Sequence, residues 1–380
     1  MALVHLIARV QAHRGGEVRA VTVDHRLRPE AAGEARFVAA FCKTLGVRHD
    51  VLAWEHGPIT GNLQDRARRA RYGLIGDWAR ANGIGHVVVG HTADDQAETF
   101  LMGLAREAGI DGLSGMRKAW TAEGIHWARP CLLTPRAELR AYLRRTGVSW
   151  VEDPSNADER FTRVKARRAL KALGPLGITV EKLSTVTTNL SIAQSALRLA
   201  ASEKAGRVVR TDAGEVIIDR KEFRRSGPEI VRRILIGALA WVGRGDYAPR
   251  ADALFRLDRA IAEGRGATLA GCRIVVKDAE IRITREAKAV MGLEGPTDML
   301  WDNRWRLTGP HDPGIRVRAL GAEGLRQCPD TRATGHSRAA LVVSPAIWRG
   351  NALVAAPLAG MGNGWTAEIV AGFHSFLLSH

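Results

Sequence analysis

The first 90 residues alternate between helical and extended patterns, and this alternation limits the fold more than any other feature of the chain. Residues 2 to 13 place four apolar side chains on one helical face, namely Leu3, Leu6, Ile7 and Val10. Gly15 and Gly16 then end the helix before the apolar run at 18 to 23. The pattern continues with a helix near 30 to 45, a strand near 49 to 53, an arginine-rich helix near 62 to 82 and a strand at 86 to 89. Such alternation predicts an α/β fold with a parallel sheet covered by helices on both faces.

The pattern changes after residue 173. We expect helices at 178 to 205, 229 to 242 and 251 to 263, followed by short strands at 272 to 276, 281 to 284, 315 to 319 and 341 to 343. The sequence therefore predicts three domains. These are a catalytic α/β domain at 1–173, a helical domain at 174–245 and a smaller, β-rich α+β domain at 246–380.

The charge balance favours a polyanionic partner. Lys and Arg number 56 against 40 Asp and Glu, which gives a net charge of +16. A nucleic acid fits this balance, and a solvated arginine-rich surface is the alternative explanation. With 46% hydrophobic residues, the chain can bury a sizeable core and is not a disordered tail.

The cysteines and the hydropathy limit the surroundings of the protein. Cys42, Cys131, Cys272 and Cys328 are far apart and form no CxxC pair, so neither a zinc site nor a disulfide framework is predicted. A reducing cytoplasm is the simplest location. No apolar run reaches the ~20 residues that span a bilayer, and we expect no membrane partner.

The segment after the strand at 86 to 89 carries the strongest chemical signal. In a helix that starts there, His91, Asp95 and Glu98 lie at i, i+4 and i+7 and share one stripe. Open parallel sheets bind their ligands at the carboxyl ends of their strands, where this stripe begins. The carboxylates could hold Mg²⁺ or orient an amine. Alternatively, Asp94 and Asp95 only complement the dipole at the start of the helix.

A polar tripeptide, Asp24-His25-Arg26, follows the first strand and should reach the same edge of the sheet. These groups could contact a nucleotide. An ordinary polar loop between strand and helix explains the tripeptide nearly as well.

Two basic helices could contact phosphate. The first holds Arg66, Arg68, Arg69 and Arg71, followed by Tyr72, and the second holds Arg160, Arg163, Lys165, Arg167, Arg168 and Lys171. Guanidinium groups bind phosphate in a two-pronged manner, although a solvated helical face is the commoner meaning of such a run.

Taken in order, the motifs resemble those of one enzyme family. They are VDHRLRP at 23–29, GHTADDQAET at 90–99 and DPSNADERF at 153–161, supported by Leu63-Gln64, Ala67-Arg68, Arg71-Tyr72, the GLSGM segment at 112–116 and Arg129-Pro130. From Met1 to about Leu170 the chain is similar to the tRNA(Ile)-lysidine synthetase family of N-type ATP pyrophosphatases. The resemblance implies the adenine nucleotide alpha hydrolase-like fold.

The resemblance also implies a reaction. Members of this family use ATP to adenylate C2 of the wobble cytidine of an isoleucine tRNA with a CAU anticodon, and L-lysine then displaces AMP. His91 and Asp95 would face ATP, Mg²⁺ and the activated base, with Asp95 as the metal ligand, while Asp95 and Glu98 would receive the lysine amine. Asp24 and His25 would line the nucleotide pocket. Arg68 and Arg71 would oppose the phosphates, and Arg163 and Arg167 would lie near ATP or tRNA.

The sequence departs from the family pattern in two places. Many members have Asn where Val164 stands, and members carry a Ser-Gly-Gly loop just before the helix that starts here at Met1. Such loops grip pyrophosphate with backbone amides, so the activity of these 380 residues alone is in question. We expect in-frame codons upstream of Met1 to encode a strand and this loop, and a genuine truncation is the alternative.

Other functions stay open at the level of sequence. A tRNA thiolation enzyme of the same superfamily would also explain the charge, but it would generally need catalytic cysteines. A catalytically inactive tRNA-binding protein is the second alternative, and the sequence also leaves a homodimer open. We assign tRNA docking to the regions after residue 173 because of one basic set, Arg220, Lys221, Arg224, Arg225, Arg232 and Arg233.

Overall fold

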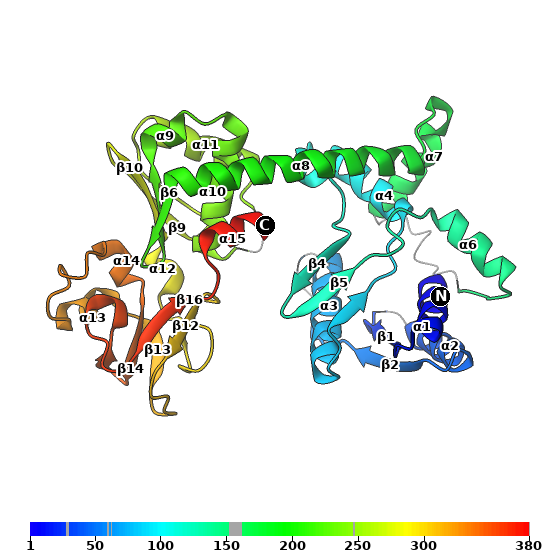
Figure 1. Ribbon diagram of the computed structural model, residues 1–380, viewed down its shortest axis with the longest axis horizontal. Coiled ribbons are helices and arrows are strands. Elements are labelled where there is room, and N and C mark those ends of the chain that lie inside the picture. The colour runs from blue at the N-terminus through cyan, green and yellow to red at the C-terminus, as the bar shows by residue number, and fades with distance from the viewer. Residues whose placement is uncertain (28–29, 59–60, 62, 152–161, 246–247, 380) are drawn as a thin grey trace. The chain divides into compact units, whose positions relative to one another are not determined.

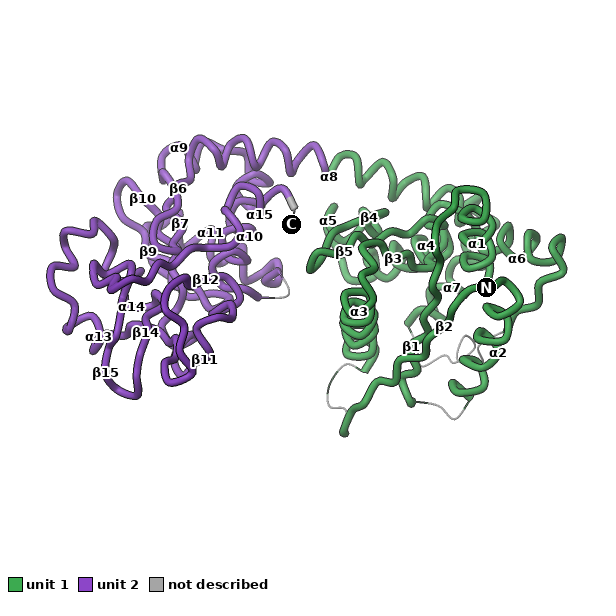
Figure 2. Tube along the Cα trace, turned by 60° about the horizontal axis from the view of Figure 1, so that its bottom comes forward, with its two compact units in different colours: residues 1–194 green, residues 195–380 purple. Residues whose placement is uncertain are grey.

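The computed structural model describes the whole chain except residues 28–29, 59–60, 62, 152–161, 246–247 and 380. The DPSNADERF motif at 153–161 thus lies outside the described residues, together with Arg160. The chain divides into two compact units, Met1–Gln194 and Ser195–His380 (Figure 2). The division falls inside one helix, α8 (Val180–Val208), which contributes to both units.

The first unit contains each helix and strand expected in the first 104 residues (Figure 1). They are α1 (Ala2–Arg14), β1 (Arg19–Asp24), α2 (Ala31–Thr44), β2 (Arg48–Ala53), α3 (Leu63–Ala81), β3 (His86–Val88) and α4 (Ala93–Leu104). Gly15 ends α1 in the left-handed conformation, with φ 77°, and its N–H bonds to the carbonyl of Gln11. A glycine suits this position because it has no Cβ to clash there.

The strands of this unit form two separate sheets. β1 pairs with β2 in parallel, from Arg19 opposite Arg48 to Asp24 opposite Ala53. β3 pairs in parallel with β5 (Ile125–Ala128), and β4 (Ala119–Ala122) adds to β5 in antiparallel fashion. No pairing joins β1 to β3 in the described part of the chain. A cavity of about 970 Å³ lies between them and is lined by residues of both strands.

The hairpin of β4 and β5 was not expected from the sequence. Its turn is Glu123-Gly124, and both residues have positive φ, 50° and 77°. Such turns match the twist of paired strands. The hairpin closes a core in which Ile75 and Ala79 of α3 pack against Val87, Ile125 and Trp127. The remaining elements of the unit are α5 (Ile110–Leu113), α6 (Arg136–Arg145), α7 (Thr162–Leu173) and η2 (Gly174–Leu176).

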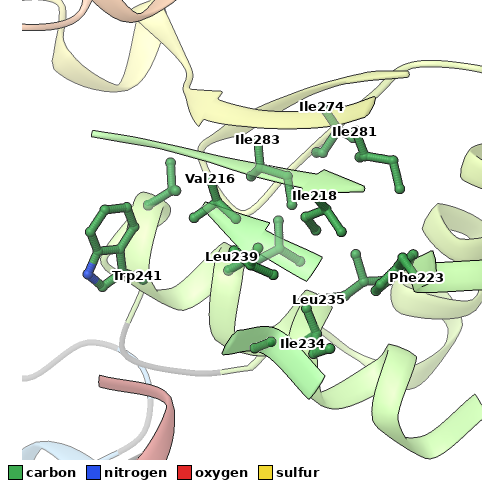
Figure 3. Close-up of a cluster of buried hydrophobic side chains, with 14 of the residues drawn as sticks. Val216, Ile218, Phe223, Ile234, Leu235, Leu239, Trp241, Ile274, Ile281 and Ile283 are labelled. Carbon is green, nitrogen blue, oxygen red and sulfur yellow. The ribbon is translucent and has the colours of Figure 1, made fainter. Parts of the chain in front are cut away.

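The second unit begins with a five-stranded antiparallel sheet in the order β6-β7-β10-β9-β8. Its elements are β6 (Val209–Asp212), β7 (Glu215–Asp219), α9 (Arg220–Arg224), α10 (Pro228–Gly243), α11 (Ala251–Ala262), β8 (Ala267–Leu269), β9 (Cys272–Val276) and β10 (Glu280–Arg285). Figure 3 shows Ile234, Leu235 and Leu239 of α10 packed with Ile218 and Ile283 of the sheet. This core is the largest in the unit, and it fixes α10 on one face of the sheet.

The sheet differs from the expected division at residue 245. β6 and β7 come from the region expected to be helical, yet they pair with each other, and β7 also pairs with β10, which lies beyond that boundary. The turn between them, Ala213-Gly214, has φ values of 42° and 82°, which is hairpin geometry. Val216, Ile217 and Ile218 are all buried, and a continuous apolar run of this length suits a buried strand.

The chain from residue 287 onward holds small sheets and short helices, as expected for a β-rich region. They are α12 (Ala287–Val290), β11 (Glu294–Gly295), β12 (Trp305–Thr308), β13 (Arg316–Ala319), α13 (Gly321–Gln327), α14 (Arg338–Val342), β14 (Pro345–Arg349), β15 (Ala352–Ala355), η3 (Pro357–Ala359), β16 (Thr366–Ile369) and α15 (Phe373–Ser379). The expected strand at 341–343 was wrong. Ser337 caps α14 by accepting a hydrogen bond from the N–H of Ala340, so the strand begins only at Pro345.

Two further features concern the cysteines and the apolar character of the helices. All four cysteines are buried and free of disulfides. Among the described residues, no helix has the length and apolar character needed to cross a membrane.

Candidate functional site

The expected site residues gather where β1, β3, α3, α4 and α7 meet in the first unit. α4 packs against α7, which brings Glu98 next to Arg167 (Figure 1). α4 starts at Ala93, with the extended residue Thr92 as its N-cap. His91 therefore precedes the helix, and the expectation that it shares a helical stripe with Asp95 and Glu98 was wrong. The N-cap has β-region dihedrals, which turn the chain before the helix begins.

His91 is held as a neutral imidazole. The Nε of Arg129 donates to Nδ1 of His91 at 3.2 Å. Because Nδ1 accepts this bond, the proton of the neutral ring sits on Nε2. Burial first, and the positive charge of Arg129 second, lower the pKa of His91 to about 4. At neutral pH the ring can thus present a single N–H donor to a ligand.

Asp95 combines a structural and a chemical position. Its Oδ2 accepts hydrogen bonds from the N–H and the hydroxyl of Thr92, both at 2.8 Å. This is the capping arrangement at the start of α4, so Oδ2 of Asp95 stabilises the helix. The other, Oδ1, lies 3.5 Å from Nη2 of Arg136. Asp94 is structural in a different way, since its Oδ2 accepts from the backbone N–H of Arg136 at 2.7 Å and ties α4 to α6.

Glu98 is a fully buried carboxylate with one unused oxygen. Its Oε1 accepts from Nε of Arg167 at 2.5 Å and lies 3.7 Å from Nη2 of Arg136. Its Oε2 is buried and has no hydrogen-bond partner among the described residues. Burial raises the pKa of Glu98 despite the two guanidinium groups. A buried acceptor without a partner favours binding of a donor, such as an amine.

His25, which is half-buried, and Arg71, which is exposed, form a second pair. Nε and Nη2 of Arg71 lie 3.3 and 3.2 Å from Nε2 of His25. Nε2 accepts, so the proton of the neutral ring is on Nδ1, a buried atom that has no partner among the described residues. Burial and then the charge of Arg71 lower the pKa of His25. Asp24 shapes this loop, because its Oδ1 accepts from the N–H of Arg26 at 2.8 Å.

Three of the four expected arginines line one of two cavities. Arg71 and Arg163 line the cavity of about 970 Å³ together with His91 and Asp95. Arg68 instead lines a second cavity of about 470 Å³, where its guanidinium lies 5.1 Å from the ring centre of Tyr72. Tyr72 lines both cavities. Arg68 and Arg71 thus border different cavities.

Sequence reasoning missed two residues of this site, Arg129 and Arg136. Arg129 is buried, and besides His91 it bonds to the carbonyl of Arg117 and the hydroxyl of Tyr72. The Arg129-Pro130 pair supported the family resemblance, but it gave the arginine no role in the site. Arg136 lies near Asp95 and Glu98, 41 and 38 positions away along the chain, and no local pattern could have indicated that contact.

The site offers few ligands to a metal ion. Within the described ranges, no group of three or more His, Cys, Asp or Glu side chains could hold one. Among the described residues that line the larger cavity, Glu17 and Asp95 carry carboxylates, and Oδ2 of Asp95 is already bonded to Thr92.

The chain is similar in sequence to known proteins over its whole length. Residues 1–173 match the sequence family described as the PP-loop domain. Over the whole chain, the protein is 46% identical to the tRNA(Ile)-lysidine synthase of Ruegeria pomeroyi, of which it covers 91%. It is 35% identical to that of Wolbachia pipientis wMel over 82% of this chain and 74% of the relative. It is 38% identical to that of a Bradyrhizobium strain over 75% of this chain and 86% of the relative.

Among solved structures, the U34-tRNA thiolase NcsA from Methanococcus maripaludis, described with its [4Fe-4S] cluster, matches with a TM-score of 0.44 and 11% identity. The match covers 50% of this chain and 67% of that one.

Proposed function

The chain belongs to the tRNA(Ile)-lysidine synthase family, and we propose that it uses ATP to adenylate the wobble cytidine of isoleucine tRNA and then joins lysine to C2 of that base. The observation that carries the proposal is the full-length similarity at 46% identity. The neutral His91 and the buried Glu98 add support, because they supply the donor and the acceptor that the two steps need.

The first step forms a bond between O2 of the cytidine and the α-phosphorus of ATP and releases pyrophosphate. Arg71 and Arg163 line the larger cavity beside His91 and would attract the phosphates. His91 would donate its Nε2–H to an oxygen that gains charge in the transition state. The volume of about 970 Å³ is within the range of ligand pockets and suits a nucleotide.

In the second step the lysine amine attacks C2 and AMP leaves. Asp95 and Glu98 would receive the amine, and Glu98 would take the proton that nitrogen loses on bond formation. A carboxylate whose pKa is raised by burial is a stronger base than an exposed one. The buried Oε2 of Glu98 is the atom that supports this role, since it has no partner among the described residues.

Mg²⁺ would neutralise phosphate charge when bound. The chain itself would contribute Oδ1 of Asp95, because Oδ2 of the same carboxylate is already bonded to Thr92. Magnesium sites beside phosphates usually take one or two protein carboxylates, so this small contribution fits the ion.

The gap between β1 and β3 supports the strand and Ser-Gly-Gly loop expected ahead of Met1. The facing edges of these two strands line the larger cavity, and neither is paired across it in the described residues. An added parallel strand would satisfy both rows of backbone groups. Its carboxyl end would then reach the edge where His91 and Asp95 lie.

The thiolation alternative loses support. Burial raises the pKa of the Cys42 and Cys131 thiols, which disfavours the reactive thiolate. Both residues are also buried from solvent.

Docking of tRNA on the second unit stays a proposal, as do a homodimer and a cytoplasmic location. Acidic neighbours neutralise part of the basic set that motivated the docking hypothesis. Arg225 pairs with Glu222, Arg232 with Glu229 and Arg224 with Asp258. The remaining positive charge still favours a polyanion.

The test is incorporation of labelled lysine into an isoleucine tRNA transcript, using the protein expressed from the complete gene. We expect incorporation that requires ATP and is lost when the wobble cytidine is replaced by uridine. Binding of tRNA and ATP without any incorporation would support the inactive tRNA-binding alternative instead.

A further inference from the structure

The smaller cavity of the first unit has a lining unlike an ordinary surface hollow. It measures about 470 Å³, and three aromatic rings from three elements border it, those of Tyr72, Trp120 and Trp127. Trp120 and Trp127 stack with ring centres 5.7 Å apart and planes at 10°. Tyr72 meets them edge-on, 5.9 and 5.2 Å away. The wall is therefore rigid and aromatic.

Positive charge surrounds these rings. Arg68, Arg80, Arg117 and Arg129 all line the cavity, against a single carboxylate, Glu123. Glu123 is already paired with Arg80 at 2.6 Å. In the described part of the chain, neither Arg68 nor Arg117 has a carboxylate partner within ion-pair distance. Aromatic rings next to unpaired guanidinium groups suit a ligand that is both planar and anionic.

Two glycines of α3 keep the cavity open. Gly73 and Gly76 lie one turn apart on the helix and both border the cavity. A Cβ placed on Gly73 would meet nothing within 4 Å. Glycine in a helix interior is less favourable than alanine, so this open space is not explained by the stability of α3.

The cavity is connected to the catalytic residues by two sets of hydrogen bonds. Arg129 donates to His91 with Nε and to the carbonyl of Arg117 with Nη1, and its guanidinium lies 4.2 Å from the ring centre of Trp120. On the other side, Oε1 of the buried Gln96 in α4 accepts from the N–H of Met116 at 2.6 Å. A ligand in this cavity would contact Arg129 and would lie next to His91 without touching it.

We propose that this cavity, bordered by Gly73, Trp120 and Arg117, binds a single-stranded nucleotide of the tRNA, the one directly 5′ or 3′ of the wobble cytidine. The proposal rests on the proposed function, because it takes tRNA as the substrate. The reacting base must reach His91, Asp95 and Glu98, which do not border this cavity, so the base held here is its neighbour. Splayed bases bind proteins by stacking on aromatic rings and guanidinium planes, and the adjoining phosphate would face Arg68 or Arg117.

The first experiment fills the cavity without removing a contact. In Gly73→Leu, a side chain enters open space on a helix that favours leucine over glycine, so the melting temperature should not fall. We expect the affinity for isoleucine tRNA to drop by about tenfold, the effect of losing one base–aromatic contact. Gly206→Leu is the matched control, because Gly206 is also an exposed helical glycine with nothing within 4 Å of its Cβ position. Arg117→Gln, with the exposed Arg14→Gln as control, tests the charge separately.

The second experiment identifies the ligand by a double-mutant cycle. Transcripts with an abasic ribose on either side of the wobble cytidine should bind the wild-type protein more weakly, and Gly73→Leu should add no further loss for one of them. The proposal would be overturned if Gly73→Leu lost the same affinity for the intact transcript and for both abasic transcripts. It would also be overturned if Gly73→Leu and Arg117→Gln both bound tRNA with wild-type affinity. A loss of ATP affinity in Gly73→Leu with unchanged tRNA affinity would assign the cavity to the free nucleotide and overturn it too. If the wild-type protein bound no tRNA at all, the proposed function would fail along with this inference.

Discussion

Arg129 donates its Nε–H to Nδ1 of His91 at 3.2 Å, across 38 positions of sequence. This contact sets which nitrogen of the ring carries the proton, and it places a positive charge beside the ring. Both effects favour a neutral His91, so the charge of this ring, which follows β3, depends on an arginine that follows β5.

Replacing this arginine should change the pH dependence of the reaction. In Arg129→Gln the charge is gone, so the pKa of His91 should rise from about 4 toward its ordinary value, although burial still holds it below 6.5. If neutral His91 is required, activity is lost as pH falls through that pKa, and the acid limb of the pH–rate profile should move to higher pH. The profile of lysine incorporation measures this, with Arg14→Gln as the control. An acid limb that stays in place would show that Arg129 does not set the charge of His91.

Asp95 and Glu98 of α4 should be essential for chemistry and dispensable for tRNA binding. We expect Asp95→Asn and Glu98→Gln to lower lysine incorporation by about 10²- to 10⁴-fold, the range for an acid or base group in catalysis. Asp95→Asn should also destabilise the protein by about 0.3 to 1 kcal/mol, because it weakens the charge at the start of α4.

The matched control for these two variants is Asp94→Asn, since Asp94 bonds only to the backbone N–H of Arg136 in the described contacts and does not border the larger cavity. It should lose stability in a thermal melt but keep most of its activity. Equal activity losses in all three variants would mean that the acids of α4 act through folding alone.

Binding of tRNA should depend steeply on salt. Each phosphate neutralised by Lys or Arg releases counterions, so log K should fall by about 0.9 per phosphate for each tenfold rise in salt concentration. A filter-binding titration over several salt concentrations gives the slope. Absence of tRNA affinity at low salt would contradict the docking proposal, and a slope near zero would show that the net charge of +16 plays no part in binding.

The four cysteines should be inert in the folded protein. All are buried, and burial raises the pKa of Cys272 to about 12. We expect a thiol-specific dye to label the native protein slowly and to label four thiols after unfolding in urea. Fast labelling of Cys42 or Cys131 in the native state would restore the thiolation alternative.

The sequence by itself predicted the features that depend on local pattern and motif. The alternation of elements through α4 follows from apolar periodicity and from breakers such as Gly15. The motif holding His91, Asp95 and Glu98 could be found because its members lie within eight positions of each other, and the resemblance to a known family gave the function that the full-length relatives support.

Tertiary structure alone decided the contacts between residues far apart in the chain. Arg167 reaches Glu98 across 69 positions and Arg129 reaches His91 across 38, and no local periodicity carries such information. The same is true of the division of Arg68 and Arg71 between two cavities, which depends on where the β4–β5 hairpin packs against α3. Secondary-structure propensity depends on the residues of one segment, whereas burial and strand pairing depend on the elements that pack against that segment. For that reason residues 341–343 looked like a strand, but the cap at Ser337 made them the end of a helix and the residue after it.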